Sequence, residues 1–373
     1  MKTIPFSSPD IQDSDLKAVE SVIRSGWLAH GKYSKKLEDL FCDYTGAKYA
    51  TTVSNCTAGL HLSCLTAGFG LGDEVIVPAQ THTATAHAVE YTGAKAVFVD
   101  VDPLSGNILL EELDRKLTDK TKGIIPVHMA GYPCKMNSIK EFCDNNGLVL
   151  IEDCAHAIGT MIDGVHAGNF GITGNFSFYP TKQITTGEGG VVISNDEQII
   201  EKVKKLKSFG IDTPPEMRTK PGVYDVQGLG YNYRMTDFQA ALGVGQMERY
   251  GENVSGRRKN AKLYCEILNN NGILFTEYSD NHSYFLFQVI FYKYIDRDKV
   301  LIGLKENGIG VSIHYATPVP LMSYYKKKYG YKDKDFPNAV HYGNQSISLP
   351  VHAKLTESDI EYICQTLLKV MEN

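Results

Sequence analysis

The chain has 373 residues, of which 43% are hydrophobic and 22% are charged, and its formal net charge is -5. These values are typical of a globular protein that is too long for one small core, so we expect two domains. The acidic balance provides no basic face, and the lysine run at 326–328 lies among tyrosines, which is typical of a solvated helix face. We therefore expect no nucleic acid among its partners.

Cysteine usage and hydropathy exclude further classes. The eight cysteines include no C-x-x-C pair, so the sequence predicts neither a zinc site nor a redox motif; we expect reduced thiols and no metal. The N-terminal stretch MKTIPFSSPDIQDSD is polar, and no run of about eighteen apolar residues offers a membrane span. We predict a cytoplasmic protein without a membrane anchor.

The first elements in chain order are two amphipathic helices. Apolar residues recur at helical spacing over 16–23 and again over 33–44. Gly26 and Gly46 follow these two patterns, and a glycine after the last periodic residue is typical of a helix C-terminus.

From residue 48 onward, short runs rich in β-branched residues alternate with helical patterns. The predicted strands are KYATTVS (48–54), EVIVP (74–78), AVFVDVD (96–102), GIIPVH (123–128) and LVLIED (148–153). The helices expected between them cover 58–67, 84–91, 111–117 and 136–145. Such alternation, with strands apolar on both faces, indicates an α/β fold whose parallel sheet is covered by helices. Ligands of such sheets bind beyond the carboxyl ends of the strands.

The C-terminal third has a different pattern. A long polar helix is expected over 252–269, and it is followed by YFLFQVIFY and LIGLKENGIGVSIHY. We interpret this part as a smaller α+β domain on which residues 1–12 pack. The predicted division is a large domain over 13–250 and a small domain over 251–373 with 1–12.

One lysine has an unusual setting. Lys182 lies in FSFYPTKQITTGEGG (176–190), between aromatic residues that favour burial and glycines that let the backbone approach a ligand. A lysine usually keeps its ammonium in water and covers the surface with its stem. Burial would instead lower the pKa of the amine, so Lys182 is a candidate nucleophile.

A candidate anion site lies between the first strand and the next helix. Residues 54–57 (SNCT) occupy a position where free backbone N–H groups point toward a ligand, and a phosphate is the simplest guest. The same residues could instead only cap the helix. The sequence contains no Walker-type phosphate loop, and GFGLG at 68–72 lacks the spacing of a dinucleotide motif.

Asp153, at the end of LVLIED, is the third candidate. A buried carboxylate needs a partner that is positive or donates a hydrogen bond, and a protonated ring nitrogen would be one; otherwise the carboxylate caps the following turn. A lysine, an anion site and an aspartate at three strand ends together match the three groups that hold pyridoxal phosphate. We therefore predict pyridoxal phosphate as the cofactor.

Five longer motifs follow one another along the chain: SGWLAHGKY, IPVHMAGYP (125–133), IEDCAHAIG (151–159), FSFYPTKQITTGEGG and GYNYRMTDFQAALG (230–243). In this order they resemble the DegT/DnrJ/EryC1/StrS family of sugar aminotransferases. The resemblance implies the aspartate-aminotransferase-like fold of type I and a homodimer with active sites at its interface. It also implies that L-glutamate donates an amino group to the keto group of a nucleotide-linked deoxy-sugar.

The family pattern implies a role for individual residues. Lys182 would bind pyridoxal phosphate covalently, Asp153 would pair with the pyridine nitrogen, and His156 would lie beside the ring hydroxyl. Thr57 and Ser177 would hold the phosphate, and Asn232 would reach the phosphate of the other subunit's cofactor. Asn55 and Cys56, from the candidate anion site, and His82 are the other predicted cofactor-binding residues.

Two positions bear on the outcome of the reaction. Relatives that dehydrate sugars replace the lysine by histidine, so Lys182 favours transamination. At His82 the family usually has an aromatic residue that stacks on the cofactor ring, and an imidazole covers less of that ring. The alternatives are a sugar dehydratase, an enzyme acting on a free keto-sugar acid, and a non-catalytic sugar-binding or regulatory protein.

Weaker candidates for substrate contacts have equally plausible structural roles. They are Glu188, Arg234, His314 and Tyr315, and His128 is either a substrate contact or a hydrogen-bonded histidine at a strand end.

Overall fold

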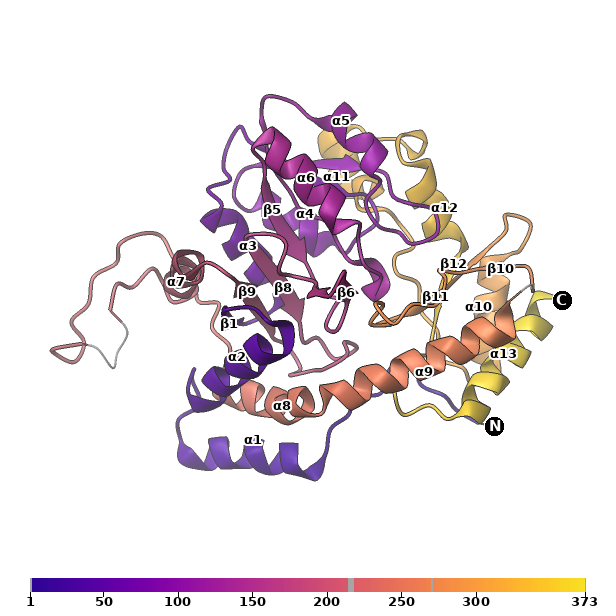
Figure 1. The fold of residues 1–373 in the computed structure, drawn as a ribbon, viewed down its shortest axis with the longest axis horizontal. Helices are drawn as coiled ribbons and strands as arrows, with labels where there is room; N and C mark the ends of the chain where they lie inside the picture. Colours follow the sequence, from indigo (N-terminus) through magenta and orange to yellow (C-terminus); the bar gives the residue numbers. More distant parts are fainter. Residues whose placement is uncertain (1, 214–217, 270, 373) are drawn as a thin grey trace.

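The computed structural model describes residues 2–213, 218–269 and 271–372. Two helices precede the central sheet, as predicted: α1 (Asp13–Ser25) and α2 (Lys32–Thr45). Each is followed by a glycine, Gly26 or Gly46, whose φ of 74° or 73° is the left-handed conformation that ends helices. Both helices pack against α8 (Asp237–Glu248), as Figure 1 shows.

A seven-stranded sheet forms the centre of the fold, in the order β1-β9-β8-β5-β4-β2-β3. The strands are β1 (Tyr49–Val53), β2 (Glu74–Pro78), β3 (Lys95–Val99), β4 (Thr121–Ile124), β5 (Val149–Asp153), β8 (Thr173–Ser177) and β9 (Gly190–Ser194). Strand β9 pairs antiparallel with both of its neighbours, and the other pairs are parallel. The predicted α/β fold with a mostly parallel sheet is confirmed.

All five predicted strands are present, and the structure adds β8 and β9, which flank the segment of Lys182. Four of the five predicted strands are shorter than expected, and two of them, β3 and β4, end three and four residues early. Strand β3 ends at Val99 because its neighbour β2 ends at Pro78, and β4 ends just before Pro126; a proline has no N–H to donate to a ladder.

The helices between the strands follow the prediction with one exception. They are α3 (Cys56–Thr66), α4 (Thr83–Glu90) and α6 (Met136–Asn146), and the structure adds α7 (Glu197–Leu206) after β9. The helix predicted over 111–117 is instead a 3-10 turn, Leu110–Glu112, followed by the single turn α5 (Leu113–Lys116). Within these two elements only Leu113 is buried, so little apolar contact supports a longer helix.

Apolar clusters lie on both faces of the sheet. In β2, Ile76 packs in a cluster with residues of α2 and α6, whereas Val75 and Val77 pack in another with residues of α3 and α4. Because both faces are covered by helices, the carboxyl ends of the strands are where a ligand has access.

The C-terminal part is built around a three-stranded antiparallel sheet, β10-β11-β12. Its elements are α9 (Tyr250–Leu268), β10 (Ile273–Leu274), β11 (Phe287–Phe291), α10 (Arg297–Glu306), β12 (Ser346–Leu349) and α13 (Glu357–Met371). Near the N-terminus, Ile4 packs in the apolar cluster formed by these elements and pairs with Ile309. In Figure 1 the long helix α9 runs from α8 beside the large sheet to this second sheet.

Two further helices of the C-terminal part pack on the large sheet instead. They are α11 (Ser323–Tyr329) and α12 (Pro337–Gln345), whose residues Tyr325 and Ala339 lie in the cluster of β2 and β3. The division into 13–250 and 251–373 with 1–12 therefore stays a prediction. The remaining elements are the strands β6 (Met161–Ile162) and β7 (Val165–His166) and 3-10 turns at Met129–Gly131, Val319–Leu321 and Asp333–Asp335.

Candidate active site

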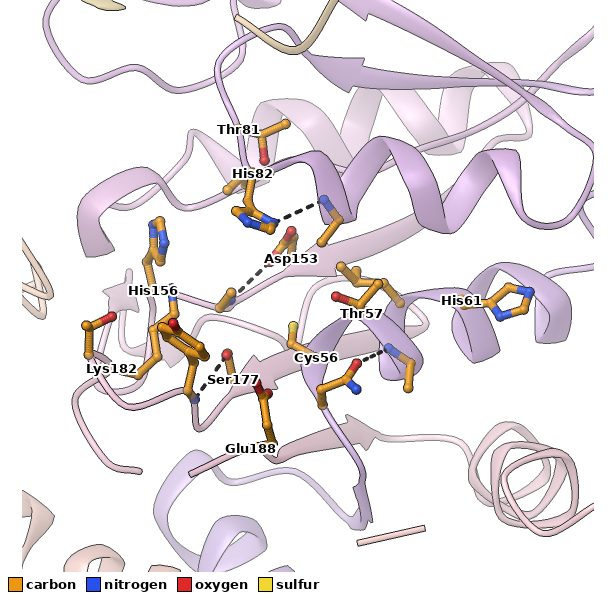
Figure 2. Close-up of a pocket in the computed structure, with 18 of the residues that line it drawn as sticks. Cys56, Thr57, His61, Thr81, His82, Asp153, His156, Ser177, Lys182 and Glu188 are labelled. Carbon is orange, nitrogen blue, oxygen red and sulfur yellow. Dashed lines mark hydrogen bonds between the residues drawn. The ribbon is translucent and has the colours of Figure 1, made fainter. Parts of the chain in front are cut away.

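A cavity of about 740 Å³ lies at the carboxyl ends of the parallel strands. Its walls come from the segments that follow β1, β2, β4, β5 and β8, and from the stretch around residue 315. The predicted site residues that line it are Asn55, Cys56, Thr57, His82, Asp153, His156, Ser177, Lys182, Glu188, His314 and Tyr315. Figure 2 shows residues from these separate segments, among them Lys182, Asp153 and Thr57, gathered in one pocket.

Lys182 is held by the turn that follows β8. Its backbone N–H donates to the carbonyl of Tyr179 over 2.9 Å, and its Nζ lies 4.4 Å from the centroid of the Phe285 ring. Burial lowers the pKa of Lys182 to about 8, although the nearby Cys56 and Asp153 oppose this shift. The amine is therefore partly neutral near physiological pH and has no carboxylate bonded to it within the described residues.

Asp153 ends β5 and is only 3% exposed. One carboxylate oxygen accepts from the Ala155 N–H over 3.1 Å, and the other accepts from the Thr85 hydroxyl over 2.8 Å. Burial raises the pKa of Asp153, while these two hydrogen bonds and the charge of Lys182 act in the opposite direction. A cation placed against this carboxylate would favour its ionised form.

The start of α3 provides an anion site. Asn55 caps the helix by accepting from the Ala58 N–H over 2.8 Å, which leaves the N–H groups of Cys56 and Thr57 without an acceptor among the described residues. Ser177 ends β8 beside them. A Cβ on Gly190 would stand 2.9 Å from the Cys56 nitrogen, so a glycine is needed for β9 to pass this close to the helix start.

Three histidines surround the lysine. Burial lowers the pKa of His82, His156 and His314, and the charge of Lys182 contributes to each shift, so all three imidazoles are neutral near pH 7. His82 caps α4, because its Nδ1 accepts from the Ala84 N–H over 3.2 Å. Its ring meets the Tyr315 ring edge to face at 5.7 Å.

Three predicted candidates do not line the cavity. Asn232 pairs with Ser208, and the guanidinium of Arg234 lies 5.0 Å from the Phe209 ring. His128 is fully buried, with its Nε2 3.2 Å from a carboxylate oxygen of Glu152, which favours its structural role.

The buried group of His128, Glu152 and Cys154 has its ligand atoms within 4.8 Å of one another. The two Glu152 oxygens, however, already accept three backbone N–H groups, those of Gly168, Phe170 and Gly171. Hydrogen bonds therefore account for this carboxylate without a metal ion.

Several residues in or next to the cavity were not anticipated from the sequence. The Thr85 hydroxyl donates to the Asp153 carboxylate, and the Phe285 ring lies under the Lys182 ammonium. Tyr233, the residue after Asn232 in the sequence, lines the cavity. Thr85 could have been found from AQTHTATAH, where it stands one helical turn after Thr81. Phe285 carries no such signal, since it lies about a hundred residues beyond Lys182.

These groups fit pyridoxal phosphate. The phosphate suits the free N–H groups at the start of α3 and the Ser177 hydroxyl, and the protonated pyridine nitrogen suits the Asp153 carboxylate. The Lys182 amine, without a bonded acceptor among the described residues, suits the carbonyl carbon.

Known proteins similar to this chain agree with that chemistry. The sequence matches the DegT/DnrJ/EryC1/StrS aminotransferase family over residues 9–368. It is 35% identical to GDP-perosamine synthase of Escherichia coli O157:H7, covering 98% of each chain. It is 34% identical to the spore coat polysaccharide biosynthesis protein SpsC of Bacillus subtilis (strain 168), covering 99% of this chain and 97% of that protein.

Solved structures agree as well. The putative sugar aminotransferase Spr1654 of Streptococcus pneumoniae, in its PMP form, superposes with a TM-score of 0.94 at 29% identity, covering 99% of each chain. The same protein in its PLP form gives a TM-score of 0.93.

No helix in the described ranges is long and apolar enough to cross a membrane.

These matches confirm the predicted enzyme class, a pyridoxal-phosphate-dependent sugar aminotransferase, together with the predicted cofactor and the fold of type I. The residue roles, by contrast, are supported by geometry alone. The chain belongs to the DegT/DnrJ/EryC1/StrS aminotransferase family.

Proposed function

We propose that the enzyme transfers an amino group from L-glutamate to the keto group of a nucleotide-linked deoxy-sugar. The observation that carries the proposal is the Lys182 amine, whose pKa is lowered to about 8, in one cavity with Asp153 and the start of α3. One relative is named for a nucleotide-linked sugar, GDP-perosamine, which supports this class of acceptor.

Each group of residues in the cavity has its own role in the proposed reaction. Pyridoxal phosphate, when bound, supplies a carbonyl that takes up the amino group and a ring that accepts electrons. Asp153 holds the proton at the ring nitrogen, and the N–H groups of Cys56 and Thr57 with the Ser177 hydroxyl hold the phosphate. The neutral Nζ of Lys182 takes a proton from the donor carbon and returns it, because its lowered pKa makes the free amine available.

We also propose that two copies of the chain form a homodimer. Asn232 lies outside the cavity of its own chain, and its neighbours Tyr231 and Tyr233 are half-buried. In a dimer, Asn232 would reach the phosphate of the other subunit's cofactor and Arg234 would meet an anionic group of the substrate. We further propose a cytoplasmic location, which agrees with eight free cysteines.

The first test is chemical. Purified holoenzyme is reduced with borohydride and digested, and the cofactor's mass is expected on the peptide that contains Lys182. A screen of keto-sugar nucleotides with glutamate then identifies the acceptor by product mass. A label on another lysine would contradict the role of Lys182, and turnover only with free keto-sugar acids would contradict the proposed acceptor.

A further inference from the structure

The hydrogen bonds of His156 fix where its proton lies. The N–H of Ala130 donates to Nδ1 of His156 over 3.3 Å, so this nitrogen carries a lone pair and the imidazole proton is on Nε2. Ala130 has a φ of 59°, a left-handed conformation that is uncommon for a residue with a side chain. The backbone therefore accepts some strain in the conformation that aims this N–H at the histidine.

The proton on Nε2 faces the Tyr315 hydroxyl. Nε2 lies 3.3 Å from the phenol oxygen, and because Nε2 carries the proton, the oxygen must accept. The phenol oxygen has no other partner in the described part of the chain. Its own hydrogen is therefore free to donate, and Tyr315 lines the cavity that contains Lys182 and Asp153.

The main chain around Tyr315 is held on both sides. The side-chain amide of Gln80 donates to the Tyr315 carbonyl over 2.8 Å, and that of Gln288 donates to the His314 carbonyl over 3.1 Å. Gln80 follows β2 of the large sheet, whereas Gln288 belongs to β11 of the second sheet. The phenol is thus placed by both parts of the fold rather than by a free loop.

We propose that Tyr315 donates a hydrogen bond to an anionic oxygen bound in the cavity, and that His156 is the positioning residue that directs this donor by occupying its lone pair. This inference rests on the proposed function. In this inference the hydrogen-bond donor to the bound oxygen is Tyr315. The family resemblance instead placed His156 itself beside the cofactor's ring hydroxyl.

The donor suits an anionic oxygen for two reasons. Burial raises the pKa of Tyr315, so the phenol stays protonated throughout the physiological range. A hydrogen bond to a charged acceptor is also roughly twice as strong as a neutral one. In this site the oxygen belongs either to the ring of the cofactor or to a carboxylate of the amino donor.

The test compares Tyr315→Phe and His156→Phe with the double variant and with Tyr362→Phe. Tyr362 is the matched control, because its hydroxyl donates to the Asn307 carbonyl and it does not line the cavity. We expect Tyr315→Phe to lower kcat/KM by roughly 10- to 100-fold. His156→Phe is expected to match much of this loss and to add almost nothing in the Tyr315→Phe background, while His156→Gln, which keeps a donor, retains more activity.

Two readouts identify the oxygen. A cofactor oxygen is indicated when Tyr315→Phe shifts the absorbance maximum of the holoenzyme and weakens cofactor binding to apoenzyme without substrate. A carboxylate oxygen is indicated when the spectrum is unchanged and only KM for glutamate rises. The inference is overturned when spectrum, cofactor affinity and KM all stay at wild-type values, or when the two single losses add in the double variant.

Failure of the proposed function is distinguishable from failure of this inference. If wild-type enzyme transfers no amine from glutamate to any keto-sugar nucleotide, the proposed function fails, whereas the holoenzyme spectrum and the cofactor affinity still test Tyr315. A lower melting temperature of Tyr315→Phe alone, with unchanged spectrum and KM, would mean a structural role and would also overturn the inference.

Discussion

Two lysines of this protein share a lowered pKa but not a role. Burial lowers the pKa of both Lys182 and Lys207 to about 8. Nζ of Lys207 donates to the Thr51 hydroxyl and to the Thr52 carbonyl, each over 2.6 Å, and lies 3.8 Å from Glu38. Nζ of Lys182 faces an aromatic ring and a cavity instead.

The difference between them teaches where reactivity comes from. Desolvation makes either amine easier to deprotonate, but the Lys207 nitrogen is committed to neighbours that hold α7 against β1. Of these two lysines, only Lys182 combines a partly neutral amine with space for a ligand. A perturbed pKa makes a lysine a candidate for a reactive role. A lysine next to a cavity whose amine is not bonded to fixed neighbours is the stronger candidate.

The largest expected effect on activity comes from replacing Lys182, and replacing Lys207 provides the comparison. Lys182→Ala should lower amine transfer by at least about 10⁴-fold with a melting temperature within about 2 °C of wild type, because it removes the reacting amine but no bonded contact. Lys207→Met should keep its activity per folded molecule and lose about 3 kcal/mol of stability, since Glu38 is left buried without its cation. Calorimetry and turnover assays on both variants check this; a Lys182→Ala enzyme with substantial turnover would contradict it.

The carboxylates beside the two lysines extend the comparison. Asp153→Asn should lower kcat/KM by roughly 100-fold, because the neutral amide no longer favours a protonated ring nitrogen. Glu38→Gln should instead lower the free energy of unfolding with little change in kcat/KM, since Glu38 accepts from Thr51 and Thr52, lies near Lys207 and His30, and does not line the cavity. Urea denaturation and steady-state kinetics separate the two effects. Equal activity losses in both variants would remove the distinction.

The pH dependence of cofactor capture isolates Lys182. With a pKa near 8, about one tenth of the amine is neutral at pH 7, and the rate of cofactor binding to apoenzyme should rise about tenfold per pH unit below 8 and level off above it. The sign follows from the lowered pKa, since deprotonation supplies the reactive form. Stopped-flow absorbance from pH 6 to 10 measures this rate, and Lys207→Met should give the same profile. A rise that continues beyond pH 9.5 would mean an ordinary lysine.

The smallest effect is expected at His82. His82→Ala removes the cap of α4 and should lower stability by about 1 kcal/mol, whereas His82→Asn keeps an acceptor for the Ala84 N–H and should stay near wild type. Thermal unfolding of the two variants measures the difference. Equal stability of the two variants would show that the cap contributes nothing. A loss of cofactor affinity shared by both variants would then measure the contact between the His82 ring and the cofactor.

The sequence predicted more of the lysine side of the cavity than of the opposite wall. Lys182, Asp153 and residues 55–57 follow three strand ends, and the carboxyl ends of parallel strands meet at one edge, so their convergence follows from the alternation of strands and helices. Phe285 lies just before β11 and Tyr315 lies beyond it; the sequence offered Tyr315 only as a weak candidate and carried no signal for Phe285.

The sequence by itself determined the fold class, through its alternation of strands and helices, and its motifs identified the family and with it the cofactor, leaving Lys182 as a predicted reacting group. Only the tertiary structure distinguished Lys182 from Lys207 and gave Tyr315 a free donor. Hydrogen-bond direction and desolvation depend on groups that are distant in the chain, such as Ala130 beside His156 and Thr51 beside Lys207. Such contacts exist only once the chain has folded and brought these distant segments together.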